Sequence, residues 1–71
     1  MIDMIKLENL LLLDDLFNNK TIVINNSTQE KIFSGLGRNP DFEIVNNAYV
    51  KEMRYNDKLN TYVIEVIYIN N

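Results

Sequence analysis

The sequence predicts one small α+β domain spanning residues 1–71. We expect an N-terminal helix packed on a four-stranded, mainly antiparallel sheet of two hairpins, with a short helical turn between the hairpins. Leucines at helical spacing near the N-terminus predict the helix, and four β-rich runs separated by turn residues predict the hairpins. A length of 71 residues with 46% hydrophobic residues allows one core and is too small for two domains.

The first 20 residues are typical of a helix followed by a turn. The apolar stripe of this helix consists of Leu7, Leu10 and Leu11. Asp14 would fall on the same apolar face, so we expect the regular helix to end near Leu13. The pair Asn18 and Asn19 then turns the chain.

Two further leucines, Leu12 and Leu13, project away from that stripe. A helix that is apolar on nearly all sides is normally buried on more than one side. Either this helix lies between other elements of its own chain, or a second molecule covers its back. Leu12 and Leu13 are therefore the candidates for self-association into a homodimer.

The first hairpin is predicted from a β-branched run at residues 21–24 and a second strand at residues 31–34. Residues 25–28 are Asn-Asn-Ser-Thr, which favour a turn, and the Gly-Leu-Gly of residues 35–37 ends the second strand.

The helical turn is predicted at residues 40–45. Asn39 is a favoured helix cap, Pro40 suits the first helical position, and the acids that follow suit the first turn. Asn46 and Asn47 stop this helix after one or two turns.

The second hairpin is predicted from strands at residues 49–55 and 61–69, with a loop at residues 56–60. If the loop holds five residues, an opposite-charge pair and a cation over a ring favour the resulting register, although other loop lengths stay open. That register places Tyr55 opposite Thr61, Met53 opposite Val63, Lys51 opposite Glu65, Arg54 opposite Tyr62 and Val50 opposite Val66.

This second hairpin is predicted to be apolar on both faces. One helix and one helical turn can cover only one face of a four-stranded sheet, so something else must cover the other. One face carries Tyr49, Met53, Val63, Ile67 and Ile69, and the other carries Val50, Tyr62, Ile64, Val66 and Tyr68.

The composition excludes several chemistries. With no cysteine and no histidine, the chain lacks disulfides, the usual zinc sites and Ser-His or Cys-His nucleophiles, so we expect neither a metal nor a cofactor nor an enzyme. The Gly-Leu-Gly of residues 35–37 is no phosphate loop, and Asp14 with Asp15 is better explained as a solvated helix end. The longest apolar run, residues 10–13, is far below the ~20 residues of a membrane span, and there is no secretory signal, so we expect a cytoplasmic protein.

The most suggestive cluster is a set of cations among tyrosines on the second hairpin. Tyrosine, arginine and methionine are enriched in protein interfaces, so this cluster predicts contact with another protein. Acids between the cations and a formal net charge of −3 make nucleic-acid binding by Lys51, Arg54 and Lys58 the less favoured alternative. The predicted partner-binding residues are Tyr49, Met53, Arg54, Tyr55 and Tyr62.

The order of features is similar to small proteins carried by phages and mobile elements of AT-rich Gram-positive bacteria. The resemblance covers most of the chain and rests on three stretches: Met-Ile-Lys-Leu-Glu-Asn-Leu-Leu from Met4 to Leu11, Glu-Lys-Ile-Phe-Ser-Gly from Glu30 to Gly35, and Ile64-Glu65-Val66. In this comparison Met4 matches the usual start, which makes Met1–Asp3 an extension.

The resemblance implies a function by contact with a host or phage protein. The sharpest form is inhibition of a host defence protein (anti-CRISPR-like), and the alternatives are a small nucleic-acid-binding module or a homo-oligomeric phage accessory protein. No functional residue can be transferred from the resemblance, because its motifs are patterns of hydrophobicity and turns.

Overall fold

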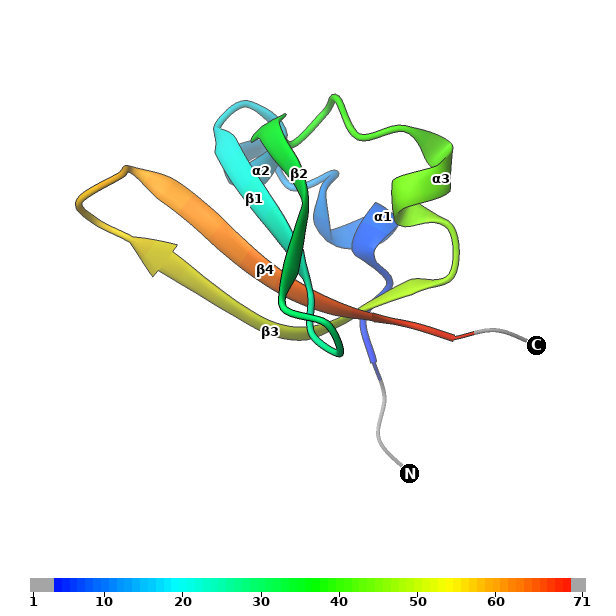
Figure 1. Ribbon diagram of the computed structural model, residues 1–71. Coiled ribbons are helices and arrows are strands. Elements are labelled where there is room, and N and C mark those ends of the chain that lie inside the picture. The colour runs from blue at the N-terminus through cyan, green and yellow to red at the C-terminus, as the bar shows by residue number, and fades with distance from the viewer. Residues whose placement is uncertain (1–3, 70–71) are drawn as a thin grey trace.

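The computed structural model describes residues 4–69, so the expectation for Met1–Asp3 lies outside the described residues. Three one-turn helices and four strands follow one another along the chain (Figure 1). They are α1 (Leu7–Leu10), α2 (Asp14–Phe17), β1 (Lys20–Asn25), β2 (Glu30–Leu36), α3 (Phe42–Val45), β3 (Ala48–Asn56) and β4 (Thr61–Tyr68).

The four strands form one mixed sheet with the order β2-β1-β4-β3. Both predicted hairpins are confirmed, since β1 pairs antiparallel with β2 and β3 pairs antiparallel with β4. The two hairpins meet through β1 and β4, which run parallel at the centre of the sheet. A parallel pair needs a crossover connection, and the segment that carries α3 provides it.

The N-terminal segment is not the single helix that the leucine spacing predicts. The helical conformation ends after α1, and the backbone of Leu13 is extended (φ −68°, ψ 135°) before α2 begins. The physical reason lies in Asp14 and Asp15, which occupy the first turn of α2, where the helix dipole favours negative charge. Because of this break, Leu16 enters the core.

The short helical turn is confirmed as α3, but it begins at Phe42 with Asp41 at the cap position, so the predicted start at Asn39 and Pro40 is wrong. Asn47 follows α3 with a left-handed backbone (φ 61°) that asparagine tolerates. The Tyr68 hydroxyl of β4 donates a hydrogen bond of 2.6 Å to the Ile44 carbonyl oxygen, which fastens α3 to the sheet. Burial raises the pKa of this tyrosine.

The segment after β2 packs closely on α2. The Gly37 N–H donates to the Asn19 carbonyl oxygen at 3.2 Å, and a Cβ atom on Gly37 would lie 2.0 Å from the Leu16 carbonyl oxygen. Only glycine allows this approach, which explains why position 37 is a glycine. The predicted end of the second strand at residues 35–37 is only partly correct, because β2 continues through Gly35 to Leu36.

The predicted register of the second hairpin is correct for one half of β3 and wrong for the other. Val50 lies opposite Val66 as predicted, but a β-bulge between Val50 and Glu52 shifts every later pair by one residue. Beyond the bulge the observed pairs are Glu52 with Glu65, Met53 with Ile64, Arg54 with Val63, Tyr55 with Tyr62 and Asn56 with Thr61. The predicted pairs of Lys51 with Glu65 and of Arg54 with Tyr62 are therefore wrong. An inserted bulge residue reverses which face each later side chain occupies.

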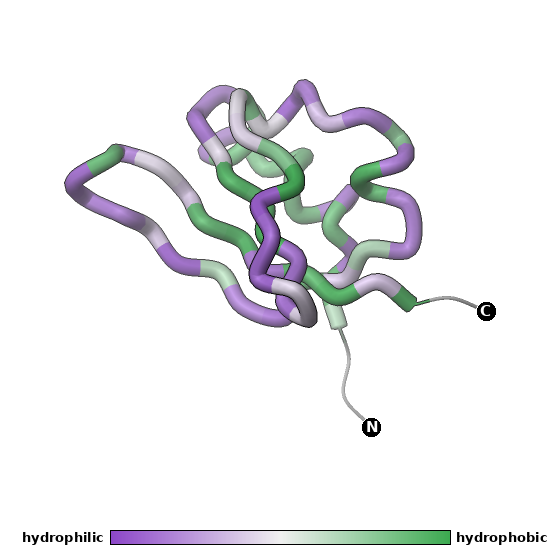
Figure 2. Tube along the Cα trace, viewed as in Figure 1, coloured by the Kyte–Doolittle hydropathy of each residue, from purple (hydrophilic) through white to green (hydrophobic). Residues whose placement is uncertain are grey.

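All three helices contribute side chains to a core on one face of the sheet, and Figure 2 shows the hydrophobic stretches of β1 and β4 facing them. The buried members are Leu7, Leu10, Leu11, Leu16, Val23, Ala48, Ile64 and Val66. Val50, Tyr62 and Tyr68 pack against this cluster, so the predicted face that they share with Ile64 and Val66 is confirmed. Val63 and Glu65 lie on the opposite face and are nevertheless buried.

Candidate functional site

The far end of the second hairpin extends beyond the helices (Figure 1). We call residues 53–62 the arm. Its turn, residues 57–60, ends at Asn60, whose backbone is left-handed (φ 50°), and the Leu59 N–H donates to the Asn56 side-chain oxygen at 3.2 Å. These local hydrogen bonds give the arm a defined shape without support from a helix.

Two tyrosines lie opposite each other on the helix side of the arm. The rings of Tyr55 and Tyr62 are 4.9 Å apart between centroids and meet edge to face at 61°. The Tyr55 hydroxyl donates to the Asn60 side-chain oxygen at 3.3 Å. This cross-strand pair holds the aromatic surface in one orientation although Tyr55 remains 48% exposed.

An open cleft of about 410 Å³ separates the arm from α2. Its walls are Leu13, Asp14, Asp15, Leu16, Met53 and Tyr62. A neighbouring hollow of similar size lies between Asn19, Tyr55, Asn60 and Tyr62. We call Leu13, Met53, Tyr55 and Tyr62 together the arm surface; Leu13 is 55% exposed and Met53 is 46% exposed.

The cleft is apolar on the arm side and acidic beside α2. Asp14 and Asp15 are exposed and stand next to Leu13, and the residues that line this cleft include no cation. The cleft therefore offers apolar contact area next to negative charge, which suits a group that combines an apolar side chain with a positive charge.

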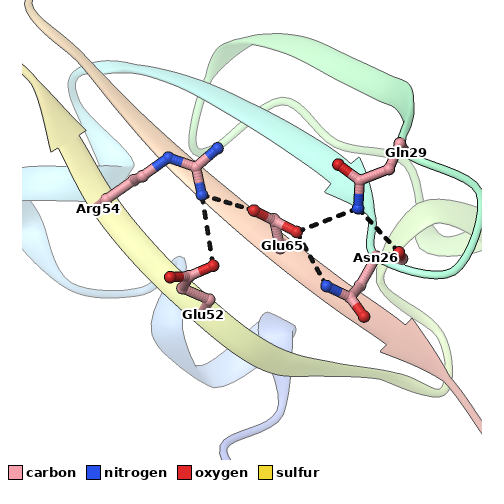
Figure 3. Close-up of polar contacts among 5 residues, drawn as sticks. All are labelled: Asn26, Gln29, Glu52, Arg54 and Glu65. Carbon is pink, nitrogen blue, oxygen red and sulfur yellow. Dashed lines mark hydrogen bonds and ion pairs between the residues drawn. The ribbon is translucent and has the colours of Figure 1, made fainter.

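The opposite face of the hairpin carries a polar network centred on Glu65 (Figure 3). The Arg54 guanidinium donates to one Glu65 carboxylate oxygen at 2.6 Å and lies 3.5 Å from the Glu52 carboxylate. The other Glu65 oxygen accepts hydrogen bonds from the side-chain amides of Asn26 at 2.9 Å and Gln29 at 3.4 Å. The network thus ties the β1–β2 turn to β4 and β3.

These hydrogen bonds stabilise the charged form of Glu65. The Arg54 guanidinium is the main cause, followed by the Asn26 and Gln29 amides, and together they lower the pKa of Glu65 to about 2. A carboxylate so fully occupied by its own chain is a structural element, so we do not place it in a binding site.

The structure separates the residues that the sequence grouped as partner-binding. Met53, Tyr55 and Tyr62 come together on the helix side, where Leu13 joins them. Tyr49 lies opposite Ile67 on the other face, so the predicted face shared by Tyr49 and Met53 is wrong; the bulge moves Met53 to the helix side.

Arg54 also lies away from the arm surface, in the Glu65 network. Two carboxylates lie within 3.5 Å of this cation, and their negative charge repels an approaching phosphate, which weakens the nucleic-acid alternative. Leu12 is 69% exposed but does not line the cleft, so the structure places only Leu13 of the two predicted self-association residues beside the arm.

Sequence reasoning missed two parts of this arrangement. One is the approach of Leu13 to the arm, for which the sequence offers no local signal. The other is the Glu65 network. The sequence does contain a signal for it, because Glu65 is the one charged residue of β4, but the predicted register paired Glu65 with Lys51 and not with Arg54.

Within residues 4–69, no cluster of acidic side chains is arranged to hold a metal ion, and no helix is long and apolar enough to cross a membrane. Comparison of the chain with known protein families, with curated proteins and with solved structures found no match.

Proposed function

We propose that this chain is a non-enzymatic protein-binding protein that contacts its partner through the arm surface. One observation carries the proposal: a methionine and two tyrosines of the arm gather around one cleft with a leucine that directly precedes α2, and Leu13, Met53 and Tyr55 of this group are about half exposed. Aromatic residues and methionine are enriched at protein interfaces, where they dominate the binding energy.

The arm surface is also suited to binding because it is pre-organised. The edge-to-face contact of Tyr55 with Tyr62 and the hydrogen bond to Asn60 fix the rings before a partner arrives. A surface that loses little side-chain freedom on binding retains more of its interaction energy as affinity.

The residues that line the cleft favour a partner of a particular chemistry. Its apolar arm side fits one or two apolar side chains, and Asp14 with Asp15 fits a lysine or arginine beside them. We therefore propose a protein segment that presents an apolar anchor next to a basic residue. The resemblance to phage and mobile-element proteins suggests a more specific form of this proposal, in which the partner is a host defence protein.

The test is affinity capture with the tagged chain from a lysate of an AT-rich Gram-positive bacterium, followed by a binding titration with the purified captured protein. The variant Leu13→Ser with Tyr55→Ser removes two exposed members of the arm surface. We expect its affinity to fall at least tenfold, as for removal of interface anchors.

The matched control is Phe42→Ser, because Phe42 is a large apolar side chain on α3 that is 70% exposed and lies outside the arm surface. We expect this variant to bind as the unchanged chain does. Equal affinity of the Leu13/Tyr55 variant and the unchanged chain would overturn the proposal, as would the absence of any captured protein. A captured protein without a role in host defence would overturn only the inhibitor form.

A further inference from the structure

The outer edge of β3 is open along most of its length. β3 is an edge strand of nine residues, and the N-terminal segment covers only its beginning, through a bridge between Lys6 and Tyr49 and a 2.7 Å hydrogen bond from the Val50 N–H to the Ile5 carbonyl oxygen. From Glu52 onward, no strand of residues 4–69 pairs with this edge. Open edges offer unpaired backbone groups to another strand.

The side chains along this edge alternate in a regular way beyond the bulge. Glu52 and Arg54 lie on the face of the Glu65 network, and Met53 and Tyr55 lie on the helix side. Natural edge strands often avoid association through a bulge or through charged side chains. Here the bulge precedes Glu52, and the charges that follow it are opposite in sign.

This alternation is self-complementary. Consider two identical edge strands that pair antiparallel about a two-fold axis perpendicular to the sheet. Side chains on one face then meet side chains of the same face, so one residue lies directly opposite the same residue of the second copy. We call this residue the position of the axis. An axis through Glu52 would place two glutamates in contact, and an axis through Arg54 would place two arginines in contact. An axis through Met53 places Glu52 opposite Arg54 twice.

We propose that a second copy of this chain pairs with β3 along this edge, with the two-fold axis at Met53. The result is a homodimer with one continuous eight-stranded sheet and all helices on the same side. The charge complementarity of Glu52 with Arg54 of the second copy selects this register, and opposite charges directly across an antiparallel pair are favourable where like charges are not.

Five exposed side chains gain partners in this dimer. The side chains of Glu52 and Arg54 are 59% and 49% exposed, and their contact within one chain is long, at 3.5 Å. Met53 packs against Met53 of the second copy on the helix side, and Tyr55 comes next to Lys51 of the second copy, where the cation can lie over the ring. The interface differs from the one predicted at Leu12 and Leu13.

Self-pairing at this edge does not rest on the proposed partner binding, and the two can fail separately. Glu52 points to the face opposite the arm surface, so Glu52→Lys removes the charge complementarity of the edge without changing the cleft. Partner capture by this variant therefore tests the arm surface, and its mass in solution tests the edge.

The first measurement is light scattering on a size-exclusion column over a wide concentration range. We expect a dimer for the unchanged chain and at least a tenfold weaker dimer for Glu52→Lys. The matched control is Asp57→Lys, which makes the same change of charge in the turn of the arm and should leave the dimer unchanged. A monomer at every concentration, or a dimer that Glu52→Lys does not weaken, would overturn the proposal.

The second measurement tests the register directly. Because the chain has no cysteine, the variant Met53→Cys carries a single thiol, and a two-fold axis at this position brings it opposite its copy within reach of a disulfide. We expect rapid oxidation of Met53→Cys to a covalent dimer and slow oxidation of Leu59→Cys, an exposed position in the turn. Equal rates, or faster oxidation of a cysteine at position 52 or 54, would contradict an axis at Met53.

Discussion

The carboxylate of Glu65 and the guanidinium of Arg54 lie 2.6 Å apart on the sheet face that the helices leave open. Glu65 is the one charge of β4, and its second oxygen is held by Asn26 and Gln29 from the β1–β2 turn. One carboxylate therefore connects two strands, β3 and β4, to a turn that is distant from them in sequence. Its burial is tolerated because each of its oxygens is hydrogen-bonded.

The stability of the fold should depend on acid through this group. The pKa of Glu65 is about 2 in the folded protein, against an ordinary value of 4.5, so the folded state binds fewer protons than the unfolded state between these values. The stabilisation is complete above the ordinary value and is lost as the pH falls from about 4.5 toward 2. Thermal unfolding followed by circular dichroism across this range should show a falling melting temperature.

The variant Glu65→Gln identifies the group responsible. It keeps the shape of the side chain but carries no titrating charge, so we expect a lower melting temperature at neutral pH and a shallower decline in acid. Glu30→Gln is the control, because Glu30 is exposed at the start of β2. An unchanged acid profile for Glu65→Gln would show that other carboxylates control the transition.

Gly37→Ala should be strongly destabilising. The new Cβ atom would lie 2.0 Å from the Leu16 carbonyl oxygen, a distance at which the backbone of α2 or of the β2–α3 segment must move. Overpacking of this kind costs about 1–3 kcal/mol. Urea unfolding measures the loss, and Asn39→Ala, an exposed position nearby, is the control. A Gly37→Ala variant as stable as the control would contradict this close approach.

Tyr68→Phe should loosen α3 from the sheet. The substitution removes only the hydroxyl that donates to the Ile44 carbonyl oxygen at 2.6 Å, so we expect a loss of about 1 kcal/mol. Amide hydrogen exchange should then rise at α3 more than in β1. Tyr49→Phe is the matched control, since the Tyr49 hydroxyl makes none of the side-chain hydrogen bonds found within residues 4–69. Equal losses in the two variants would contradict the anchoring role.

Local signals account for the parts of the fold that the sequence predicted. Two hairpins and the turn of α3 follow from β-branched runs, asparagine turns and acids near a helix start, all of which act between near neighbours. The parallel contact of β1 with β4 joins residues about 40 positions apart and has no local signature. The break before α2 had a signal in Asp14 and Asp15, but an acidic pair fits the end of one apolar stripe as well as the start of a second helix.

The sequence predicted only part of the candidate site. It shows the residue types directly, but it does not show on which face of the sheet each side chain lies. Met53, Tyr55 and Tyr62 follow from their residue types within the predicted second hairpin. The predicted register placed Met53 beside Tyr49 on one face and Tyr62 opposite Arg54 on the other, and the bulge in β3 reversed the faces beyond Val50.

The leucines of the N-terminal segment separate into core and surface in a way that mutation can measure. Leu7 is fully buried and Leu12 is 69% exposed, although the two are five positions apart in one leucine-rich segment. Leu7→Ala should cost about 2–5 kcal/mol because it removes packed methyl groups and leaves a cavity. Leu12→Ala should change the stability by no more than about 0.5 kcal/mol. Chemical unfolding in urea measures both.

A loss of that size at Leu7 approaches the whole stability of a domain of this length, which is about 0.05–0.15 kcal/mol per residue, so Leu7→Ala leaves little folded baseline from which to measure unfolding. Leu7→Met supplies a milder version, because it conserves volume and should cost less than about 1.5 kcal/mol. At a protein concentration where the dimer is dissociated, Leu12→Ala should behave as the unchanged chain does. A loss for Leu12→Ala equal to that for Leu7→Met would place Leu12 in the core and contradict its exposed position between α1 and α2.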